Sequence, residues 1–322
     1  MSVRPASGGR DMLRFVGRAL GAAMVLLAFS EFVFVNEEPA GRVVDSGGPG
    51  ALMVTAQLLA FYMLTGVLYA GFAPWLTSWP RMVLAGAFLG WSIEAAMVPV
   101  AYENIPFSYA WTAISWHAVV DVAFGLALYP LALRAGLATA IGATLAFGLC
   151  WAVWSTWVLP WMDLPPADFA RLAAVVVALL VAGYALLFAS GTARPSRRGR
   201  QALWAAGALN LALWAVWATG FPVAAAGLAV LAAFTAFAFR RAPEGHLAVW
   251  AGAPPGALRL ALPALAGVTA TIAFSAMHTR GLAPEAELLT GGAMILGMVI
   301  FALAVAAALR PGRGATEDRE HP

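Results

Sequence analysis

Four ionisable side chains lie inside apolar segments of this chain. Glu31, Glu94, His117 and Asp121 are each flanked by predominantly hydrophobic residues. A charged side chain at the centre of a bilayer costs about 2.5–3.5 kcal/mol on insertion scales, so such residues usually face a bundle interior or a cavity. Histidine and carboxylates together can move protons near neutral pH or bind zinc or iron. These positions are therefore the candidate site.

Spacing predicts which of these groups meet. His117 and Asp121 are four residues apart, which places them on one face of a helix. At α-helical spacing this face continues through Ala110 and Ala113. Only a short connection separates the Glu94 segment from the next, so the two are predicted to be antiparallel neighbours, with Glu94 facing His117. Glu94, His117 and Asp121 are the predicted catalytic group, or the ligands of a divalent metal.

A second set of residues is predicted to line the mouth of this site or to support it. The set is Glu31, Glu103, Asn104, Trp111, Trp116, Trp151, Trp154 and His278. Tryptophans commonly form a belt at headgroup level, which accounts for most of those here. Trp151 lies deeper than such a belt, and an aromatic wall around an outward-opening cavity would suit an apolar or cationic ligand.

The elements that position these residues are predicted to be membrane-spanning helices. The chain has 322 residues, 62% hydrophobic and 11% charged, whereas a soluble domain carries about 25% charged residues. Apolar segments near the twenty residues that a bilayer requires recur along the chain. They lie at roughly residues 12–36, 51–73, 80–101, 109–133, 137–160, 167–190, 202–219, 221–239, 257–277 and 288–309. The fold expected is an all-α bundle of about ten spans, although 202–239 can also be read as one long kinked helix.

Charge placement orients the expected bundle. Sixteen of the nineteen arginines fall at inner positions if the N-terminus is inside, and only Arg42, Arg171 and Arg280 fall outside. This positive-inside bias predicts both termini in the cytoplasm. The location expected is a bacterial cytoplasmic membrane. No A-x-A site follows the first apolar stretch, so it is predicted to remain as the first span.

One transmembrane domain is predicted over residues 1–310. It contains helices 1–6, at about 12–190, and helices 7–10, at about 202–309. Residues 311–322 are predicted to be a disordered tail. Residues 36–50 are predicted to form the longest outer loop, and the stretch LAVWAG, residues 247–252, is expected along the inner interface.

Missing residue types exclude several chemistries. All nineteen basic residues are arginine, which excludes retinal or PLP bound as a Schiff base and a Walker A lysine. The single cysteine, Cys150, excludes a cysteine-ligated iron–sulfur cluster and a C-x-x-C-H haem site, and is expected to be a small buried hydrophobe. Scattered arginines give no nucleic-acid signal. The partners expected are the lipid bilayer and a lipid-like or small-molecule ligand from the outer leaflet.

One pattern resembles a known family. Residues 37–42 fit E-E-x-x-x-R, the first motif of the CAAX-type intramembrane proteases, and His117-x-x-x-Asp121 resembles their last motif. That family also has an F-x-x-x-H motif, and no histidine lies between the two motifs here. Pro39 and Gly41 also predict a loop where the family has a helix, so no residue role is carried over.

Three functions remain open on the sequence. The first is a membrane-embedded enzyme acting on a lipid-like substrate, which predicts a cavity open to the outer leaflet only. The second is a proton- or cation-coupled transporter, which predicts a path continuing to the cytoplasm. The third is a structural subunit of a membrane complex, which predicts mutually satisfied polar groups and no cavity.

Overall fold

The computed structural model describes residues 8–192, 194–247 and 249–310, so the predicted tail at 311–322 lies outside it. Every regular element in the described ranges is a helix. In chain order they are α1 (Gly8–Leu27), η1 (Ala28–Val33), α2 (Glu37–Phe72), η2 (Ala73–Trp75), α3 (Trp79–Trp91), η3 (Ser92–Met97), η4 (Pro99–Tyr102), α4 (Phe107–Ala110), η5 (Ala113–Leu128), α5 (Tyr129–Arg134), α6 (Leu137–Trp154), η6 (Ser155–Val158), α7 (Pro166–Ser190), α8 (Arg197–Gly220), α9 (Pro222–Arg241), α10 (Ala257–Leu260), α11 (Pro263–Thr279) and α12 (Ala286–Leu309).

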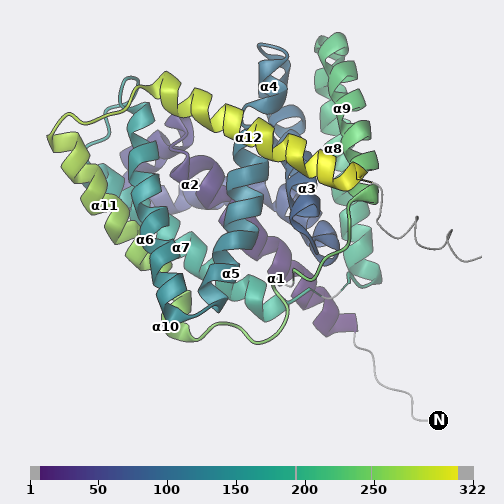
Figure 1. The fold of residues 1–322 in the computed structure, drawn as a ribbon, viewed down its shortest axis with the longest axis horizontal. Helices are drawn as coiled ribbons and strands as arrows, with labels where there is room; N and C mark the ends of the chain where they lie inside the picture. Colours follow the sequence, from purple (N-terminus) through teal and green to yellow (C-terminus); the bar gives the residue numbers. More distant parts are fainter. Residues whose placement is uncertain (1–7, 193, 248, 311–322) are drawn as a thin grey trace, which may run out of the picture.

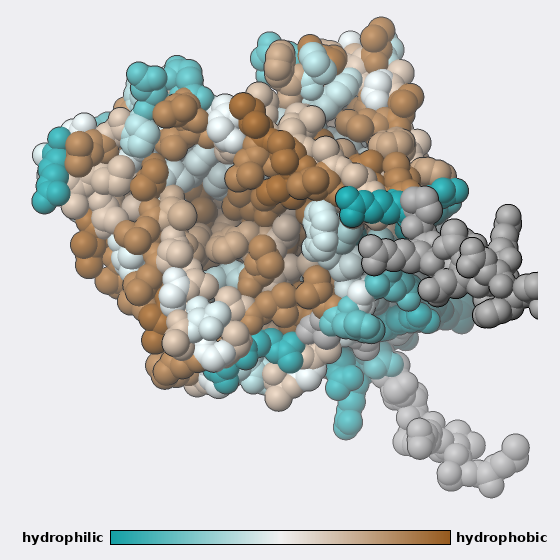
Figure 2. Space-filling view, viewed as in Figure 1, coloured by the Kyte–Doolittle hydropathy of each residue, from teal (hydrophilic) through white to brown (hydrophobic). Residues whose placement is uncertain are grey.

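The helices are those of an integral membrane protein. Nine helical stretches of the described chain are long and apolar enough to cross a bilayer. Figure 2 shows hydrophilic residues mainly towards the upper and lower margins of one face, with broad hydrophobic surface between them. α8 and α9 are separate helices that each qualify as a span, so residues 202–239 are not one helix. The predicted span at 80–101 is not among the nine; its helical part, α3 with η3, carries Arg81 and Glu94.

α1 runs from the lower margin of the molecule in Figure 1 towards the interior, where η1 is buried. α1 packs against α2 and α7, and Phe29 and Phe32 of η1 are fully buried. α6, α7 and α11 pack together on one side, while α8 and α9 lie at the other. α12 crosses obliquely over η5 and α3. The ionisable residues of η1, η3 and η5 are therefore held in the interior.

The closest approach that bears on the site is between α3 and η5. A Cβ atom built on Gly90 would lie 2.2 Å from the carbonyl oxygen of Ala113, and one on Gly86 would lie 2.7 Å from Cα of Ala118. The contacts repeat every four residues on α3 but every five on η5, because η5 is a π-helix with i→i+5 hydrogen bonding. The predicted face through Ala110 is wrong, since Ala110 belongs to the separate helix α4.

Residues 36–50 do not form the predicted loop. α2 begins at Glu37 and runs through this stretch, with a kink at Gly47 and Gly48, where φ is 56° and 39°. Proline is tolerated in the first turn of a helix, which is where Pro39 lies. Glu37 and the glutamate that follows it suit the positive end of the helix dipole. A stretch whose proline and glycine suggest a loop can therefore also begin a helix.

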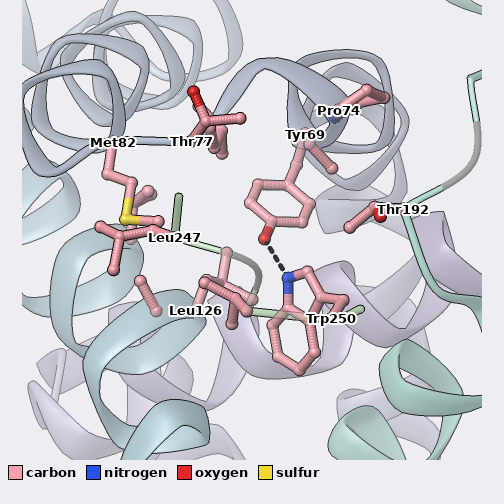
Figure 3. A pocket seen from close by; sticks show the side chains of 13 residues that line it. Tyr69, Pro74, Thr77, Met82, Leu126, Thr192, Leu247 and Trp250 are labelled. Atoms are coloured by element: carbon pink, nitrogen blue, oxygen red, sulfur yellow. Dashed lines mark hydrogen bonds between the residues drawn. The ribbon is translucent and has the colours of Figure 1, made fainter. Parts of the chain in front are cut away.

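Two further predictions concern Trp250 and Cys150, and the packing corrects the one for Cys150. Trp250, in the segment expected along the inner interface, is 2% exposed, and its indole N–H donates to the Tyr69 hydroxyl at 2.8 Å (Figure 3). An apolar ring with one satisfied polar atom is stable inside the bundle. Cys150 was expected to be buried, but it lies exposed on α6. In a spanning helix that exposed surface faces lipid, which suits the same apolar side chain.

Candidate functional site

The centre of the candidate site is a histidine held between two carboxylates. His117 Nε2 lies 2.7 Å from Oε1 of Glu94, and its Nδ1 lies 2.7 Å from Oδ2 of Asp121. All three residues are buried, and Asp121 is fully so. The structure thus joins the three residues predicted as the catalytic group in one chain of hydrogen bonds. Such a chain fixes the orientation of the imidazole and provides a route for a proton.

Ser30 secures the buried end of this chain. Its hydroxyl donates to Oδ2 of Asp121 at 2.5 Å and lies 3.3 Å from Nδ1 of His117. The other oxygen of Asp121, Oδ1, is buried with no hydrogen-bond partner in the described chain. Serine and aspartate both face the same ring nitrogen, so this is not the serine–histidine–aspartate arrangement that activates a serine nucleophile. Asp121 anchors the histidine from behind.

Glu31 is a second buried carboxylate with its own donors. The Tyr62 hydroxyl donates to its Oε1 at 2.5 Å, and the Asn36 amide donates to its Oε2 at 2.8 Å. Tyr62 is fully buried, whereas Glu31 is 8% exposed. Two donors to a buried carboxylate compensate part of its desolvation. Glu31 therefore has a phenol and an amide as hydrogen-bond donors, whereas Glu94 is bonded to an imidazole.

All four ionisable residues lie on π-helical segments. Glu31 is on η1, Glu94 is on η3, and His117 and Asp121 are on η5. Backbone bonds five residues apart, such as His117 N to Thr112 O at 2.8 Å, show this geometry. π-helical turns are rare and occur frequently at functional sites. Their coincidence with these four residues supports a functional role for the cluster.

The backbone beside these segments is strained. Val35 follows η1 with φ 58°, and Thr112 precedes η5 with φ 57°. Positive φ in a β-branched residue is a genuine outlier and costs of the order of 1–3 kcal/mol. Neighbours of both residues line a cavity beside Glu94 and His117, since Phe34, Asn36 and Trp111 contribute to its wall. Strain of this kind tends to cluster at functional sites.

A cavity of about 700 Å³ opens beside the chain of hydrogen bonds. Its polar lining comes from the four helical elements η1, α2, η3 and η5 and from two residues outside them, Asn36 and Thr112. It comprises Ser30, Glu31, Asn36, Glu38, Arg42, Gln57, Tyr62, Glu94, Thr112 and His117. The volume is within the range of about 300–1,000 Å³ that is typical of small-molecule sites. Glu94 and His117 form part of the wall, while Asp121 lies behind it. A ligand in the cavity can therefore reach Glu94 and His117.

The tryptophans predicted near the site divide into two groups. Trp111 and Trp116 line the cavity, together with Trp157, which the sequence did not single out for the site. Trp154 packs behind them, with its ring centroid 4.6 Å from that of Trp116. Trp151 is 2% exposed and stacks on another buried ring, that of the α6 phenylalanine four residues earlier. An aromatic wall therefore exists, but it is built by part of the predicted set.

Three predicted mouth residues lie elsewhere. Glu103 and Asn104 line a neighbouring hollow of about 370 Å³ with Glu287 of α12. This hollow shares Val100 and Trp111 with the main cavity. His278 is on α11, where its ring lies 5.9 Å from that of Phe274, and it does not line the cavity. The mouth is formed instead by the start of α2, which was predicted to be a loop.

The arrangement does not suit the predicted divalent metal. A metal requires ligands that converge on one point, as in tetrahedral zinc sites. Glu94 and Asp121 bind opposite nitrogens of one imidazole ring, so their carboxylates are held on opposite sides of it. In the described part of the chain no group of three or more histidine, cysteine, aspartate or glutamate side chains is placed to hold a metal ion. The geometry favours proton transfer.

Sequence reasoning missed three supporting residues. Ser30, Asn36 and Tyr62 hydrogen-bond to the carboxylates, but none was assigned to the site. A signal was present for two of them, because Ser30 precedes Glu31 directly and Tyr62 lies in an otherwise apolar run. A polar atom in a membrane span requires a partner, so each such residue is a candidate partner for the ionisable groups.

No protein-family model matches the chain, and no curated protein and no solved structure matches it.

Proposed function

We propose that the protein is a membrane-embedded enzyme that carries out acid–base chemistry on an amphiphile entering from the outer leaflet. The observation that carries the proposal is the His117 imidazole, bonded on both sides to carboxylates at the wall of a cavity of about 700 Å³. A purely structural knot of the same residues needs no cavity. A general acid or base must lie within hydrogen-bond reach of a bound ligand, and the cavity provides that access.

Glu94 is the proposed group that exchanges a proton with the substrate. Asp121 and Ser30 hold Nδ1 of His117, so Nε2 is directed at Oε1 of Glu94. The second oxygen of Glu94 makes no hydrogen bond within the described chain, and its residue lines the cavity. A proton taken by Glu94 from the substrate can be passed to His117, whose positive charge Asp121 balances. The proton then returns from His117 through Glu94 to the product, so that both groups end in their starting states.

Glu31 is the proposed second carboxyl of the reaction. It faces the same cavity but is bonded to a phenol and an amide, whereas Glu94 is bonded to an imidazole. Two carboxyls in different environments hold protons differently, which is how acid and base roles are separated in one site. Glu31 would therefore stay ionised and stabilise positive charge on the substrate while Glu94 exchanges the proton.

The membrane topology proposed is ten spans, with α3 and η3 (residues 79–97) as the span additional to the nine apolar stretches and both termini in the cytoplasm. Glu38 at the start of α2 and Val100 after η3 line the same cavity. They lie on one side of the membrane only if residues 79–97 cross it. In a Cys150→Ala background, a membrane-impermeant thiol reagent should label Glu38→Cys and Asn104→Cys from the outside. Labelling of the two from opposite sides would refute the crossing.

The enzymatic proposal is tested by turnover in reconstituted membranes. Wild-type protein in liposomes of mixed bacterial lipids should produce a new lipid species, detected by mass spectrometry. Glu94→Gln and His117→Ala are expected to lower its rate by about 10²–10⁴-fold, the usual contribution of acid–base catalysis. His278→Ala changes a histidine outside the cavity and should retain the wild-type rate. No new species with wild type, or equal rates in all variants, would reject the enzyme.

A transporter remains the second candidate because a separate hollow is lined by Val122, the residue that follows Asp121. This smaller hollow, of about 110 Å³, is lined by Tyr69 of α2 and by Val122 and Leu126 of η5 (Figure 3). It shares no lining residue with the main cavity. Asp121 immediately precedes Val122 and its Oδ1 is unbonded in the described chain, as expected of a relay between two half-paths. Proton flux into liposomes under an imposed potential, lost in Asp121→Asn, would favour this function.

A further inference from the structure

The wall of the main cavity is unusually aromatic. Six rings line it, those of Phe34, Phe61, Tyr62, Trp111, Trp116 and Trp157. The indole N–H of Trp116 donates to the Phe29 carbonyl at 3.1 Å, and that of Trp157 donates to the Phe34 carbonyl at 2.7 Å. An indole has only this one donor. These two rings therefore offer the cavity carbon and π surface only, which attracts cations.

Two carboxyl groups line the interior of the cavity, whereas its one arginine lies at the rim. Glu31 and Glu94 are each 8% exposed and line it, and Oε2 of Glu94 has no hydrogen-bond partner in the described chain. His117 lines it too, but both its nitrogens are already bonded to carboxylates. A positive charge on His117 would be balanced by Asp121. Glu31 and Glu94 thus remain to bind a positive group.

The rim does not reverse this balance. Arg42 is the one arginine among the cavity residues, and Glu38 lies one helical turn before it on α2. The two opposite charges largely offset each other at the exposed mouth. Arg42 also donates to the amide oxygen of Gln57 at 3.3 Å. An anionic headgroup would have to pass this rim and then lie against two carboxylates.

We infer that the cavity binds the ammonium headgroup of a cationic amphiphile. The inference rests on the proposed function and names the class of its substrate. The headgroup lies against Trp116 and Trp157, and its charge faces Glu31 and Glu94. The chain leaves past Leu58 and Phe61 of α2, which line the cavity, and Phe61 is also 36% exposed on the outside. Aromatic cages are a recognised means of binding quaternary ammonium groups, and carboxylates add the attraction of opposite charge.

The test uses full-length protein in nanodiscs and three short probes with the same chain. Hexyltrimethylammonium, hexyl sulfate and hexyl glucoside share the hexyl chain and carry a positive, a negative and a neutral headgroup, and binding is measured by titration calorimetry. The ammonium probe is expected to bind at least about tenfold more tightly than the glucoside, with no binding of the sulfate. Trp157→Leu should weaken ammonium binding about 2- to 30-fold, the range that corresponds to one cation–π contact. Glu31→Gln should weaken it about tenfold.

Matched controls lie beside the site. Trp161 is 56% exposed and its ring is 5.6 Å from that of Trp157, but it does not line the cavity. Glu103 lines the neighbouring hollow. Trp161→Leu and Glu103→Gln should therefore bind the ammonium probe as wild type does, and size-exclusion profiles verify that all variants are folded.

The outcomes separate this inference from the proposed function. Equal affinity for the three headgroups, no binding of any, or wild-type affinity in both Trp157→Leu and Glu31→Gln overturns the cationic ligand, whatever the turnover assay shows. Selective ammonium binding that both variants weaken supports it, even if wild-type protein produces no new lipid. In that case the enzyme is rejected and the binding site is retained.

Discussion

The substitution Gly90→Ala should separate Glu94 on η3 from His117 on η5. Gly90 lies one helical turn before Glu94, and a Cβ there would be 2.2 Å from the carbonyl oxygen of Ala113 on η5. Carbon and oxygen in contact normally lie about 3.3–3.6 Å apart. The obstacle is backbone, which cannot rotate away as a side chain can. The helices must therefore move apart by about 1 Å to restore that contact distance.

The expected movement is enough to break the hydrogen bond between Glu94 and His117. That bond is 2.7 Å long, and a shift of about 1 Å takes it beyond the usual limit of about 3.2 Å. Overpacking costs about 1–3 kcal/mol, whereas replacing glycine by alanine within a helix gains about 1 kcal/mol. Gly142 on α6 has no atom within 4 Å of a built Cβ, so Gly142→Ala measures the propensity gain alone. The expected difference between the two variants is about 1–3 kcal/mol.

A double-mutant cycle identifies the cause of this loss. Equilibrium unfolding of Gly90→Ala, Gly142→Ala and their combinations with Glu94→Gln is measured in mixed micelles. Glu94→Gln should be less costly in the Gly90→Ala background, because the bond to His117 is already broken, with a coupling of about 0.5–3 kcal/mol. It should cost the same with and without Gly142→Ala. Equal stability of the two glycine variants, or no coupling, would refute the tight α3–η5 contact as the determinant of the site.

Three shorter predictions use the same stability assay or metal analysis. Tyr62→Phe removes one of two donors to a buried carboxylate and should destabilise by about 1.5–3 kcal/mol; no loss would mean that the carboxylate is solvated by water. Trp250→Ala loses its bond to Tyr69 and a buried ring, so about 3–5 kcal/mol is expected, against about 0.5 kcal/mol or less for Trp204→Ala, whose side chain is 76% exposed. Purified wild type and His117→Ala should contain equally little zinc; stoichiometric zinc in wild type alone would contradict the donor arrangement.

The spans were predictable because their signal is local. Each is an apolar run of sufficient length, and nine are present in the described chain. The predicted span at 80–101 is the one outside these nine, since Arg81 and Glu94 make residues 79–97 more polar. Arg81 is buried because its side chain bonds the Ala242 carbonyl at 3.1 Å, a contact 161 residues away. A hydrogen bond of this kind offsets the cost of burying a polar side chain. Its partner is distant in the sequence, so the segment alone does not predict it.

The contacts of the site could be predicted only between residues that are close in the sequence. Glu94 and His117 are 23 residues apart, and their pairing follows from antiparallel neighbours. Glu31 and Tyr62 are separated by the whole first part of α2, and their bond depends on how α2 packs on η1. The start of α2 was misjudged because proline and glycine predict a loop by composition. They are equally compatible with a helix whose first turn holds the proline and whose kink holds the glycines.

The π-helical segments explain why the contacts of η5 do not follow the predicted α-helical face. They also link the backbone geometry to the hydrogen bonds of the ionisable residues. With five-residue spacing, Ala113 and Ala118 meet the glycines of α3, and His117, between them in sequence, is brought to Glu94. An α-helix in place of η5 would shift each successive turn and separate these contacts. Ordinary α-helical packing could bury the same apolar residues without strained backbone at Val35 and Thr112. Rare turns and strain persist only where surrounding structure compensates them. Here the compensating contacts are the hydrogen bonds of the four ionisable groups, so the local geometry and the polar chain depend on each other.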